Sequence, residues 1–288
     1  MGFPPDCNMP RSVAFGDRLG YFQANMTNTV LLAIDGPRAT ITLNDPAKHN
    51  RLDPAGLTLL RQAIDKADAD PDVRVTVLTG AGEKAFCVGG DQTTREEGGY
   101  KGKPSRSDLG LDIEDLHSVI RDIPKPVIAA VNGYAIGGGH VLHVLCDLTI
   151  ASDNAKFGQV GPKVGSVYPG FGTMYLARIV GEKRAREFWY LCEQYTAEDC
   201  RQMGLVNKVV PASQLMNEAR AWGLKIAGMS PTAITLAKAS FNAPSEEIRG
   251  IGAVALRGLA LYYGTEEALE GRNAFLEKRP PEFAKFRR

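Results

Sequence analysis

The chain has 288 residues, which is enough for one large hydrophobic core or for a core with a smaller helical domain. Its 34 Lys and Arg residues nearly balance its 33 Asp and Glu residues, so the net charge of +1 excludes a general attraction to nucleic acid or to an anionic membrane. The five cysteines are odd in number, lack CxxC spacing and lie mostly in apolar stretches, which is typical of reduced thiols in a cytoplasmic protein.

The first 28 residues lack the basic-then-apolar order of a signal peptide. We expect residues 1–28 to form an N-terminal tail or a subunit-contact arm, and we assign them no chemistry. No apolar run in the chain reaches the roughly 18 residues that are typical of a membrane-spanning helix, so we expect no membrane partner.

The next segments predict a hairpin and a helix. Residues 29–35 and 38–43 are short β-type runs on either side of Gly36, a pattern typical of a β-hairpin. Residues 54–69 have helical periodicity, with Asp53 in the N-cap position and a proline at the first helical position.

Further strands follow. Residues 73–78 have apolar side chains at alternate positions, residues 126–131 are apolar throughout, and residues 148–151 predict a short third strand. Residues 93–110 between them are polar and glycine-rich, which indicates a mobile loop over a site. The alternation of strands and helices favours an α/β core with parallel strand pairing.

From about Ala212 onward the apolar pattern becomes helical, which indicates a C-terminal helical domain. The expected helices cover residues 212–229, 231–241, 246–263 and 265–278.

Two glycine-rich turns each follow an apolar strand: FCVGGD at residues 86–91 and GYAIGGGH at residues 133–140. A glycine lets a ligand approach the backbone closely, so that an N–H group can point at an incoming oxygen. N–H groups from two segments can converge on one carbonyl oxygen and stabilise it as it becomes an oxyanion. The second turn opens onto a helix N-terminus, which also favours negative charge. A pair of tight turns without chemistry is the alternative.

Long strings of the sequence resemble the crotonase (enoyl-CoA hydratase/isomerase) superfamily, from about Val30 to the C-terminus. The branch that it resembles most contains 1,4-dihydroxy-2-naphthoyl-CoA synthase and 2-ketocyclohexanecarboxyl-CoA hydrolase. The strings are AFCVGGDQ (85–92), GYAIGGGHVLHVLCDLTIA (133–151), FGQVGPKVGS (157–166), KRAREFWYLCEQY (183–195) and YYGTEEALEGRNAFLEKRPPEF (262–283).

The resemblance implies an α/β fold with a crotonase-like ββα spiral core and a C-terminal helical oligomerisation domain. On this basis residues 29–211 form the core, which carries the CoA and oxyanion site, and residues 212–288 form the helical domain. The resemblance also implies a homo-oligomer, a trimer or a hexamer, that acts on an acyl-CoA substrate without a tightly bound cofactor.

Carried over residue by residue, the oxyanion donors fall on the backbone N–H groups of Gly90 and Gly138. Enoyl-CoA hydratases add water with two glutamates, and the matching positions here are Val141 and Gly161. Neither residue can carry a proton, so simple hydration lacks its usual acid–base groups.

Glycine at position 161 matches the naphthoyl-CoA synthase branch, where a bicarbonate ion fills the space of the missing carboxylate and a preceding Gln, here Gln159, helps to hold it. The alternative is that Gly161 only starts a turn with Pro162. Ser166 matches a serine of the same branch, but the branch's aspartate is Tyr168 here.

A tyrosine is normally a proton donor, whereas an aspartate is a ready base at neutral pH. Tyr168 therefore indicates a different substrate, an acid in place of a base, or a base supplied from elsewhere. A tyrosine that merely packs on Phe171 is the alternative.

Other residues match the branch more loosely. Tyr100 and Tyr263 correspond to tyrosines that face the acyl group, the latter from the same or a neighbouring subunit. Arg95 corresponds to a basic loop residue, while a nearby family lysine is Thr93 here. Asp91 follows the first oxyanion donor, and we expect it to stabilise the turn.

Coenzyme A needs cations for its phosphates and a slot for its adenine. The strand end at Val88 corresponds to the adenine slot. The candidate phosphate contacts are Lys48, Arg51 and Lys278, with Arg279 and Lys285 as further candidates; a solvated charged face is the alternative for each.

The four histidines lack an acidic partner or a third ligand at metal-binding spacing, so we expect no metal site. His140 and His143 lie on the helix after the second glycine turn, and His49 and His117 are interpreted as surface or structural residues.

The leading hypothesis is an acyl-CoA enzyme that cleaves or forms a C–C bond next to a thioester, with ring-opening hydrolysis of a 2-oxocycloalkane-carboxyl-CoA preferred over naphthoyl-CoA-type ring closure. The alternative is a hydratase or isomerase reaction on an unusual acyl-CoA that uses other acid–base residues. A crotonase-fold RNA-binding protein is disfavoured, because the charge is balanced and no basic stripe is present.

Overall fold

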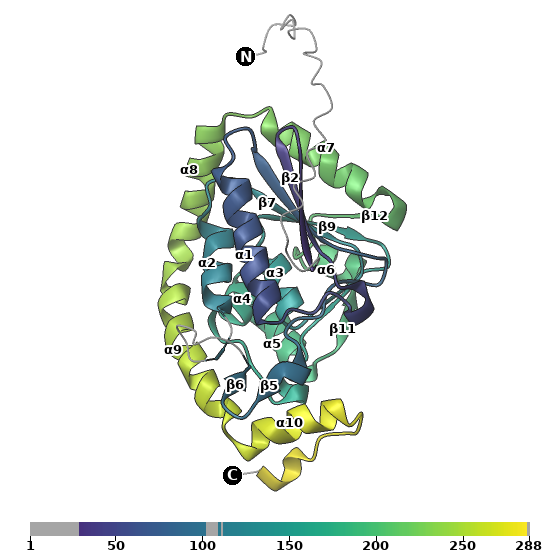
Figure 1. Cartoon of the computed structure of the whole chain (residues 1–288), viewed down its shortest axis with the longest axis vertical. Coiled ribbons are helices and arrows are strands. Elements are labelled where there is room, and N and C mark those ends of the chain that lie inside the picture. Colours follow the sequence, from purple (N-terminus) through teal and green to yellow (C-terminus); the bar gives the residue numbers. More distant parts are fainter. Residues whose placement is uncertain (1–28, 102–108, 111, 287–288) are drawn as a thin grey trace, which may run out of the picture.

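A six-stranded sheet and a four-stranded sheet form the centre of the computed structural model, which describes residues 29–101, 109–110 and 112–286 (Figure 1). The larger sheet has the order β1-β2-β3-β7-β9-β12 and the smaller one β11-β10-β8-β4. The strands are β1 (Val30–Asp35), β2 (Arg38–Leu43), β3 (Val75–Gly80), β4 (Ala85–Cys87), β7 (Val127–Val131), β8 (Tyr134–Ile136), β9 (Leu148–Ser152), β10 (Lys156–Gly158), β11 (Gln194–Thr196) and β12 (Lys208–Val210).

Strand pairing in the larger sheet confirms the α/β prediction. β1 and β2 form the expected antiparallel hairpin, in which Val30 pairs with Leu43 and Asp35 with Arg38. All later neighbours, from β2 to β12, are parallel. The three predicted strands after the hairpin are present as β3, β7 and β9, with their ends shifted by one or two residues.

The chain repeats a strand of the larger sheet, a short strand of the smaller sheet and then one or more helices, which is the expected ββα spiral. The short strands β4, β8 and β10 have three residues each and pair in parallel. The helices are α1 (Pro54–Ala69), α2 (Ile113–Asp122), α3 (Gly138–Leu145), α4 (Met174–Val180), α5 (Glu182–Leu191), α6 (Ala197–Gln202), α7 (Leu215–Ala227), α8 (Pro231–Asn242), α9 (Glu246–Tyr263) and α10 (Glu266–Leu276).

The start of α1 follows the sequence signals. The Asp53 carboxylate accepts a hydrogen bond from the N–H group of Gly56 at 2.7 Å, which caps the helix, and Pro54 lies in the first turn. This confirms the predicted N-cap.

Apolar residues pack on both faces of the larger sheet. Val75 and Val77 of β3 lie on the face that α7 covers with Leu215 and Ala219, whereas Leu78 lies in the large cluster on the other face. The alternation follows from the two-residue period of a strand. Although α7 packs on this sheet, the predicted domain boundary after residue 211 is not tested and stays a prediction.

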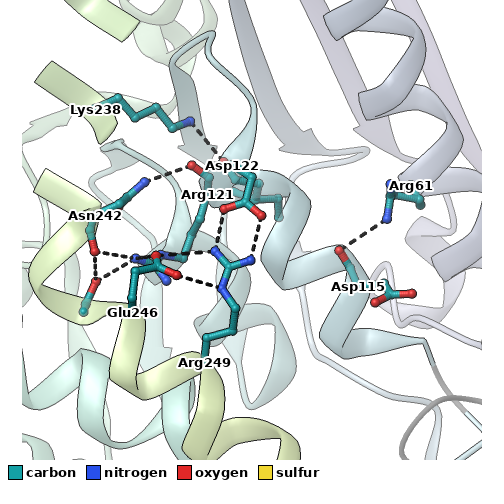
Figure 2. A network of polar contacts seen from close by, with 10 residues as sticks. Arg61, Asp115, Arg121, Asp122, Lys238, Asn242, Glu246 and Arg249 are labelled. Atoms are coloured by element: carbon teal, nitrogen blue, oxygen red, sulfur yellow. Dashed lines mark hydrogen bonds and ion pairs between the residues drawn. The ribbon is translucent and has the colours of Figure 1, made fainter. Parts of the chain in front are cut away.

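The helices α8 and α9 run along one side of the molecule to α10 at its end (Figure 1). Figure 2 shows how they are joined to α2. Arg249 of α9 binds Asp122 with two hydrogen bonds of 2.5 and 2.7 Å, and Arg121 lies 3.6 Å from Glu246. The Asn242 amide donates to the Arg121 carbonyl at 2.9 Å. These contacts attach the C-terminal helices to the core.

Candidate active site

A pocket of about 990 Å³ is lined by both glycine turns, by the segment after β10 and by the helices α9 and α10. The sequence-predicted site residues meet there, although their roles stay predictions. All of them except Arg95, Arg279 and Lys285 line this pocket: Lys48, Arg51, Val88, Gly90, Asp91, Tyr100, Gly138, Gln159, Gly161, Ser166, Tyr168, Tyr263 and Lys278.

The two glycine turns lie against each other. Gly89 has φ +81°, and a Cβ atom on it would lie 2.6 Å from the backbone nitrogen of Gly138. Only glycine permits that backbone angle without strain together with so close an approach. A Cβ atom on Gly138 would in turn lie 3.7 Å from the nitrogen of Gly90. The backbone N–H groups of Gly90 and Gly138 are therefore neighbours at the pocket wall.

Neither N–H group has a hydrogen-bond acceptor within the described part of the chain. The backbone of Leu52 forms hydrogen bonds with the residues on either side of Gly90. Its N–H donates to the Gly89 carbonyl at 2.8 Å, and its carbonyl accepts from the Asp91 N–H at 2.9 Å. Gly138 is the first residue of α3, where N–H groups lack intrahelical partners. Two such donors can hold a carbonyl oxygen that becomes negatively charged.

The two positions that match the hydratase glutamates, Val141 and Gly161, are tightly packed. Val141 is buried in α3, with 1% of its surface exposed. A Cβ atom on Gly161 would lie 2.7 Å from the Ser166 carbonyl oxygen and 2.8 Å from Cζ3 of Trp189. The aromatic ring therefore fills the space into which a longer side chain would extend.

Two polar groups near Gly161 that could hold a bicarbonate ion, on Gln159 and Lys163, have partners within the protein. The Gln159 amide nitrogen lies 3.1 Å from Nδ1 of His140, so that amide is engaged with the imidazole. Burial lowers the pKa of His140 to about 3, which leaves the imidazole neutral. The nearby Lys163 donates to the Cys192 carbonyl at 3.0 Å. Gly161 also begins a 3₁₀ turn, Gly161–Val164, which the alternative interpretation expects; the bicarbonate stays a prediction of the resemblance.

Two tyrosines form one wall of the pocket. The Tyr263 hydroxyl lies 2.7 Å from the Ser166 hydroxyl of the same chain, so this chain's own Tyr263 reaches its pocket. The rings of Tyr100 and Tyr263 pack edge to face at 6.1 Å, and Gln92 donates to the Tyr100 hydroxyl at 3.3 Å. Burial, with a smaller effect from Tyr263, raises the pKa of Tyr100 well above its ordinary value, so its phenol keeps its proton.

Arg95 lies behind this wall and does not line the pocket. It is 1% exposed, its guanidinium carbon lies 4.6 Å from the centre of the Tyr263 ring, and it donates to the Ala268 carbonyl at 2.7 Å. The Arg95 guanidinium is thus paired with the π face of Tyr263 and with a backbone carbonyl of α10. Its position therefore indicates that it supports Tyr263, and not that it contacts a ligand as a basic loop residue.

Tyr168 has a partner that the sequence did not reveal. Its hydroxyl lies 2.6 Å from Nδ1 of His117, and the two rings pack edge to face at 5.0 Å. His117 is fully buried, which excludes the surface position and leaves the structural one of the two interpretations. Phe171 packs edge-on against His117 at 6.5 Å.

Three basic residues line the pocket from distant parts of the chain. Lys48 and Lys278 are exposed, with Lys48 at 4.0 Å from Asp45, and Arg51 makes a shorter ion pair of 2.8 Å with Asp91. Asp91 also accepts from the backbone N–H of Thr93 at 2.9 Å, which matches its expected role in the turn. Arg279 and Lys285 both contact Glu270, at 2.6 and 3.6 Å, which leaves them less suited to bind phosphate.

The described cysteines are buried thiols. Cys87, Cys146, Cys192 and Cys200 are buried and free, and burial raises the pKa of Cys87 to about 12. Cys7 and residues 102–108 of the expected loop lie outside the described residues. Within the described ranges no cluster of three or more potential metal ligands occurs, and no helix is long and apolar enough to cross a membrane.

One sequence signal could have found His117. The buried positions of α2 are Leu116, His117, Ile120 and Arg121, so the histidine and the arginine share the helix face that points inward. A histidine on the apolar side of an amphipathic helix is a candidate for a buried role. By contrast, the contact of Trp189 with Gly161 joins separate elements, and nothing in the sequence indicates it.

Comparisons with known proteins agree on one family. The family model for enoyl-CoA hydratase/isomerase matches residues 37–286. An enoyl-CoA hydratase from Bacillus anthracis is 31% identical, with 88% of this chain and 98% of that chain covered and a TM-score of 0.69. A carnitinyl-CoA hydratase from Mycobacterium avium is also 31% identical, with 89% and 98% covered and a TM-score of 0.75. An enoyl-CoA hydratase from Mycobacterium avium subsp. paratuberculosis K-10 is 26% identical, with 88% and 98% covered and a TM-score of 0.78.

Proposed function

This chain belongs to the enoyl-CoA hydratase/isomerase family, and from that premise we propose that it binds an acyl-CoA thioester and stabilises its enolate with the N–H groups of Gly90 and Gly138. The contact between the two glycine turns carries this proposal, because it brings together at one pocket two donors that have no acceptor among the described residues. Such donors strengthen their hydrogen bonds as the thioester oxygen gains charge, and this selectively lowers the barrier to enolate formation.

We propose ring-opening hydrolysis of a 2-oxocycloalkane-carboxyl-CoA as the reaction. Water adds to the ring ketone, the bond between that carbon and Cα breaks, and the electron pair passes to Cα and the thioester oxygen. The products are a carboxylic acid and a thioester enolate, which then takes up a proton. The tightly packed positions at Val141 and Gly161 support this choice, because the chemistry does not call on the two glutamates of hydration.

A hydratase or isomerase reaction on an unusual enoyl-CoA is the second candidate. The similar solved structures carry names of this kind, enoyl-CoA hydratase and carnitinyl-CoA hydratase. The acid–base groups would then have to be residues such as Tyr100 or Tyr168, since Asp91 is the only carboxylate among the described residues that line the pocket.

The basic residues at the pocket suggest how coenzyme A binds. We propose that Lys48 and Lys278 contact its phosphates, with the adenine near Val88, since all three residues line the pocket. We also propose a homo-oligomer, a trimer or hexamer, which is supported by exposed apolar residues on α9 such as Val254 and Leu261. The cytoplasmic location stays a prediction.

Three substrates separate the candidate reactions: 2-oxocyclohexane-1-carboxyl-CoA, o-succinylbenzoyl-CoA and crotonyl-CoA. We expect the first to gain one water and lose its ketone, as followed by mass spectrometry and NMR. Hydration of crotonyl-CoA alone would favour the second candidate, and ring closure of the o-succinylbenzoyl ester would contradict the preference for hydrolysis.

A further inference from the structure

The contact between Tyr168 and His117 joins a residue of the pocket wall to a residue of the core. Tyr168 lines the pocket, whereas His117 belongs to α2 and is 0% exposed. The distance of 2.6 Å between the phenol oxygen and Nδ1 is that of a short hydrogen bond. No other nitrogen or oxygen atom of the described residues is bonded to the imidazole, because its Nε2 is buried without a partner.

Both members of the pair are neutral near pH 7. Burial lowers the pKa of His117 to about 3. Burial also raises the pKa of Tyr168 above its ordinary value. The nearby Glu114 carboxylate, which lies about one turn before His117 on α2, adds to this effect. The phenol therefore retains a proton, and the imidazole carries one proton on either Nδ1 or Nε2.

A proton on Nε2 would leave an N–H donor buried without an acceptor, and such orphaned donors are rare in proteins. The tautomer with the proton on Nδ1 avoids this, because Nδ1–H then donates to the phenol oxygen. In that arrangement the phenol's own proton is not used by His117, and Tyr168 can offer it to a ligand in the pocket.

The imidazole is held in place from behind. Phe171 packs against it at 6.5 Å, and the Arg121 guanidinium lies 5.0 Å from the Phe171 ring. Arg121 in turn belongs to the network that attaches α2 to α8 and α9 (Figure 2). The histidine thus projects from a helix that is anchored at its far end.

We propose that Tyr168 donates the proton that quenches the thioester enolate at Cα, and that His117 is a positioning residue that orients the phenol and stabilises the phenolate left behind. This inference rests on the proposed enolate function. It assigns the proton donor of that function, and it holds for ring opening and for hydration alike, since both end with a protonated Cα.

The proton transfer balances. The O–H bond of Tyr168 breaks, its electron pair stays on the phenol oxygen, and a C–H bond forms at Cα from the enolate electron pair. The phenolate accepts the hydrogen bond from Nδ1–H of His117 and recovers a proton from water or from the new carboxylic acid. No oxidant or additional reactant is needed.

Deuterium uptake at Cα during turnover in D₂O tests this step directly, because a neutral phenol can protonate an enolate but cannot remove a Cα proton from a bound thioester. 2-Oxocyclohexane-1-carboxyl-CoA and crotonyl-CoA are each incubated with the protein in D₂O. Formation of the product with deuterium at Cα is followed by NMR, and binding is measured separately by calorimetry with heptanedioyl-CoA, the expected product of ring opening. We expect Tyr168→Phe to slow formation of the product about 100-fold or more, while the dissociation constant of the ester stays the same.

Variants of His117 separate positioning from packing. His117→Leu removes the donor to the phenol and should slow formation of the product at least about tenfold. His117→Asn places an amide donor close to the former Nδ1 and should restore much of the lost rate, which a purely structural role would not predict. Tyr190→Phe, on an exposed tyrosine of α5, serves as the control for tyrosine substitution.

The outcomes are distinguishable. Formation of the product at the normal rate in Tyr168→Phe would overturn the assignment of the proton donor while leaving the enolate function intact. Equal rates in the Leu and Asn variants would overturn the role of His117. No turnover of either substrate by the unaltered protein would overturn the proposed function itself, and this inference with it.

Discussion

Trp189 occupies the space into which a side chain at Gly161 would extend. A Cβ atom on Gly161 would lie 2.8 Å from Cζ3 of the indole, and the indole N–H donates to the Gly172 carbonyl at 2.7 Å, which holds the ring there. The absence of a glutamate at position 161 is therefore matched by the packing around it.

Gly161→Ala should destabilise the protein. The added Cβ would meet a backbone carbonyl and an anchored ring, and such overpacking costs about 1–3 kcal/mol of the free energy of unfolding. Urea denaturation provides the measurement. Gly250→Ala, in α9 with open space around its Cβ position, is the matched control and should stabilise by up to about 1 kcal/mol. An unchanged midpoint for Gly161→Ala would show that Trp189 moves aside freely.

Removal of bicarbonate should not change the rate of the reaction, because the Gln159 amide that would hold that ion is already engaged with His140. The turnover rate in degassed, carbonate-free buffer is compared with the rate after bicarbonate is added back at constant ionic strength and pH. Equal concentrations of chloride serve as the control. A rate that rises specifically with bicarbonate would support the anion that the family resemblance implies.

Gly138→Pro should abolish most activity. Proline lacks the N–H group that we propose for the oxyanion, and although it suits the first position of a helix, its ring would crowd Gly89, so some stability should be lost as well. Loss of one such donor should lower kcat about 100- to 1,000-fold.

Gly138→Ala is the matched control, because it adds a Cβ at the same place but keeps the N–H group. Equal activity of the Pro and Ala variants, measured with the same acyl-CoA and at equal thermal stability, would be inconsistent with a catalytic role for this donor.

Stability should fall as the solution is acidified below about pH 6.5. Burial lowers the pKa of both His117 and His140 from 6.5 to about 3, and it lowers that of His143 as well. Between these values the unfolded chain binds protons that the folded chain does not. The free energy of unfolding therefore falls by up to about 1.4 kcal/mol for each pH unit of acidification and for each histidine. Above pH 6.5 this contribution is constant.

The slope of unfolding free energy against pH can be assigned with His143→Leu, since His143 does not line the pocket. Urea denaturation between pH 7.5 and 5 should give a slope smaller by about one proton in this variant. His49→Leu, at an exposed position, should leave the slope unchanged. Identical slopes for all three proteins would contradict the neutral state of the buried imidazole.

A charge on the exposed apolar face of α9 should dissociate the proposed oligomer. Val254 and Leu261 are 73% and 79% exposed and lie two turns apart on that helix. Replacement of both by Glu should lower the molar mass measured by light scattering, because it would bury charge in an apolar interface. Glu83→Lys, on an exposed loop, is the control. A mass that remains unchanged would place the interface elsewhere.

Local signals predicted the elements that depend on neighbouring residues. Asp53 and Pro54 predicted the start of α1 because a cap and a preset φ angle act within one helical turn. The glycine turns were recognisable because close backbone approach restricts the residue type at Gly89 and Gly138. The resemblance to the family then predicted that these segments meet at one site.

Long-range partners were not predictable in the same way. Tyr168 and His117 are separated by 51 residues, and their hydrogen bond depends on how α2 packs against the segment before α4. The three-residue strands β4, β8 and β10 are too short for their own periodicity to show. Arg95 was expected at the ligand, but its pairing with Tyr263 and α10 depends on a contact that crosses most of the chain.

The docking of α10 has a consequence for the order in which the site matures during synthesis. Gly271 packs directly on the backbone of Gly165, and Tyr263 and Lys278 line the same pocket as Lys48 near the other end of the chain. A nascent chain on the ribosome has both glycine turns long before it has α9 and α10. The pocket can therefore close around a thioester only after almost the whole chain has left the ribosome.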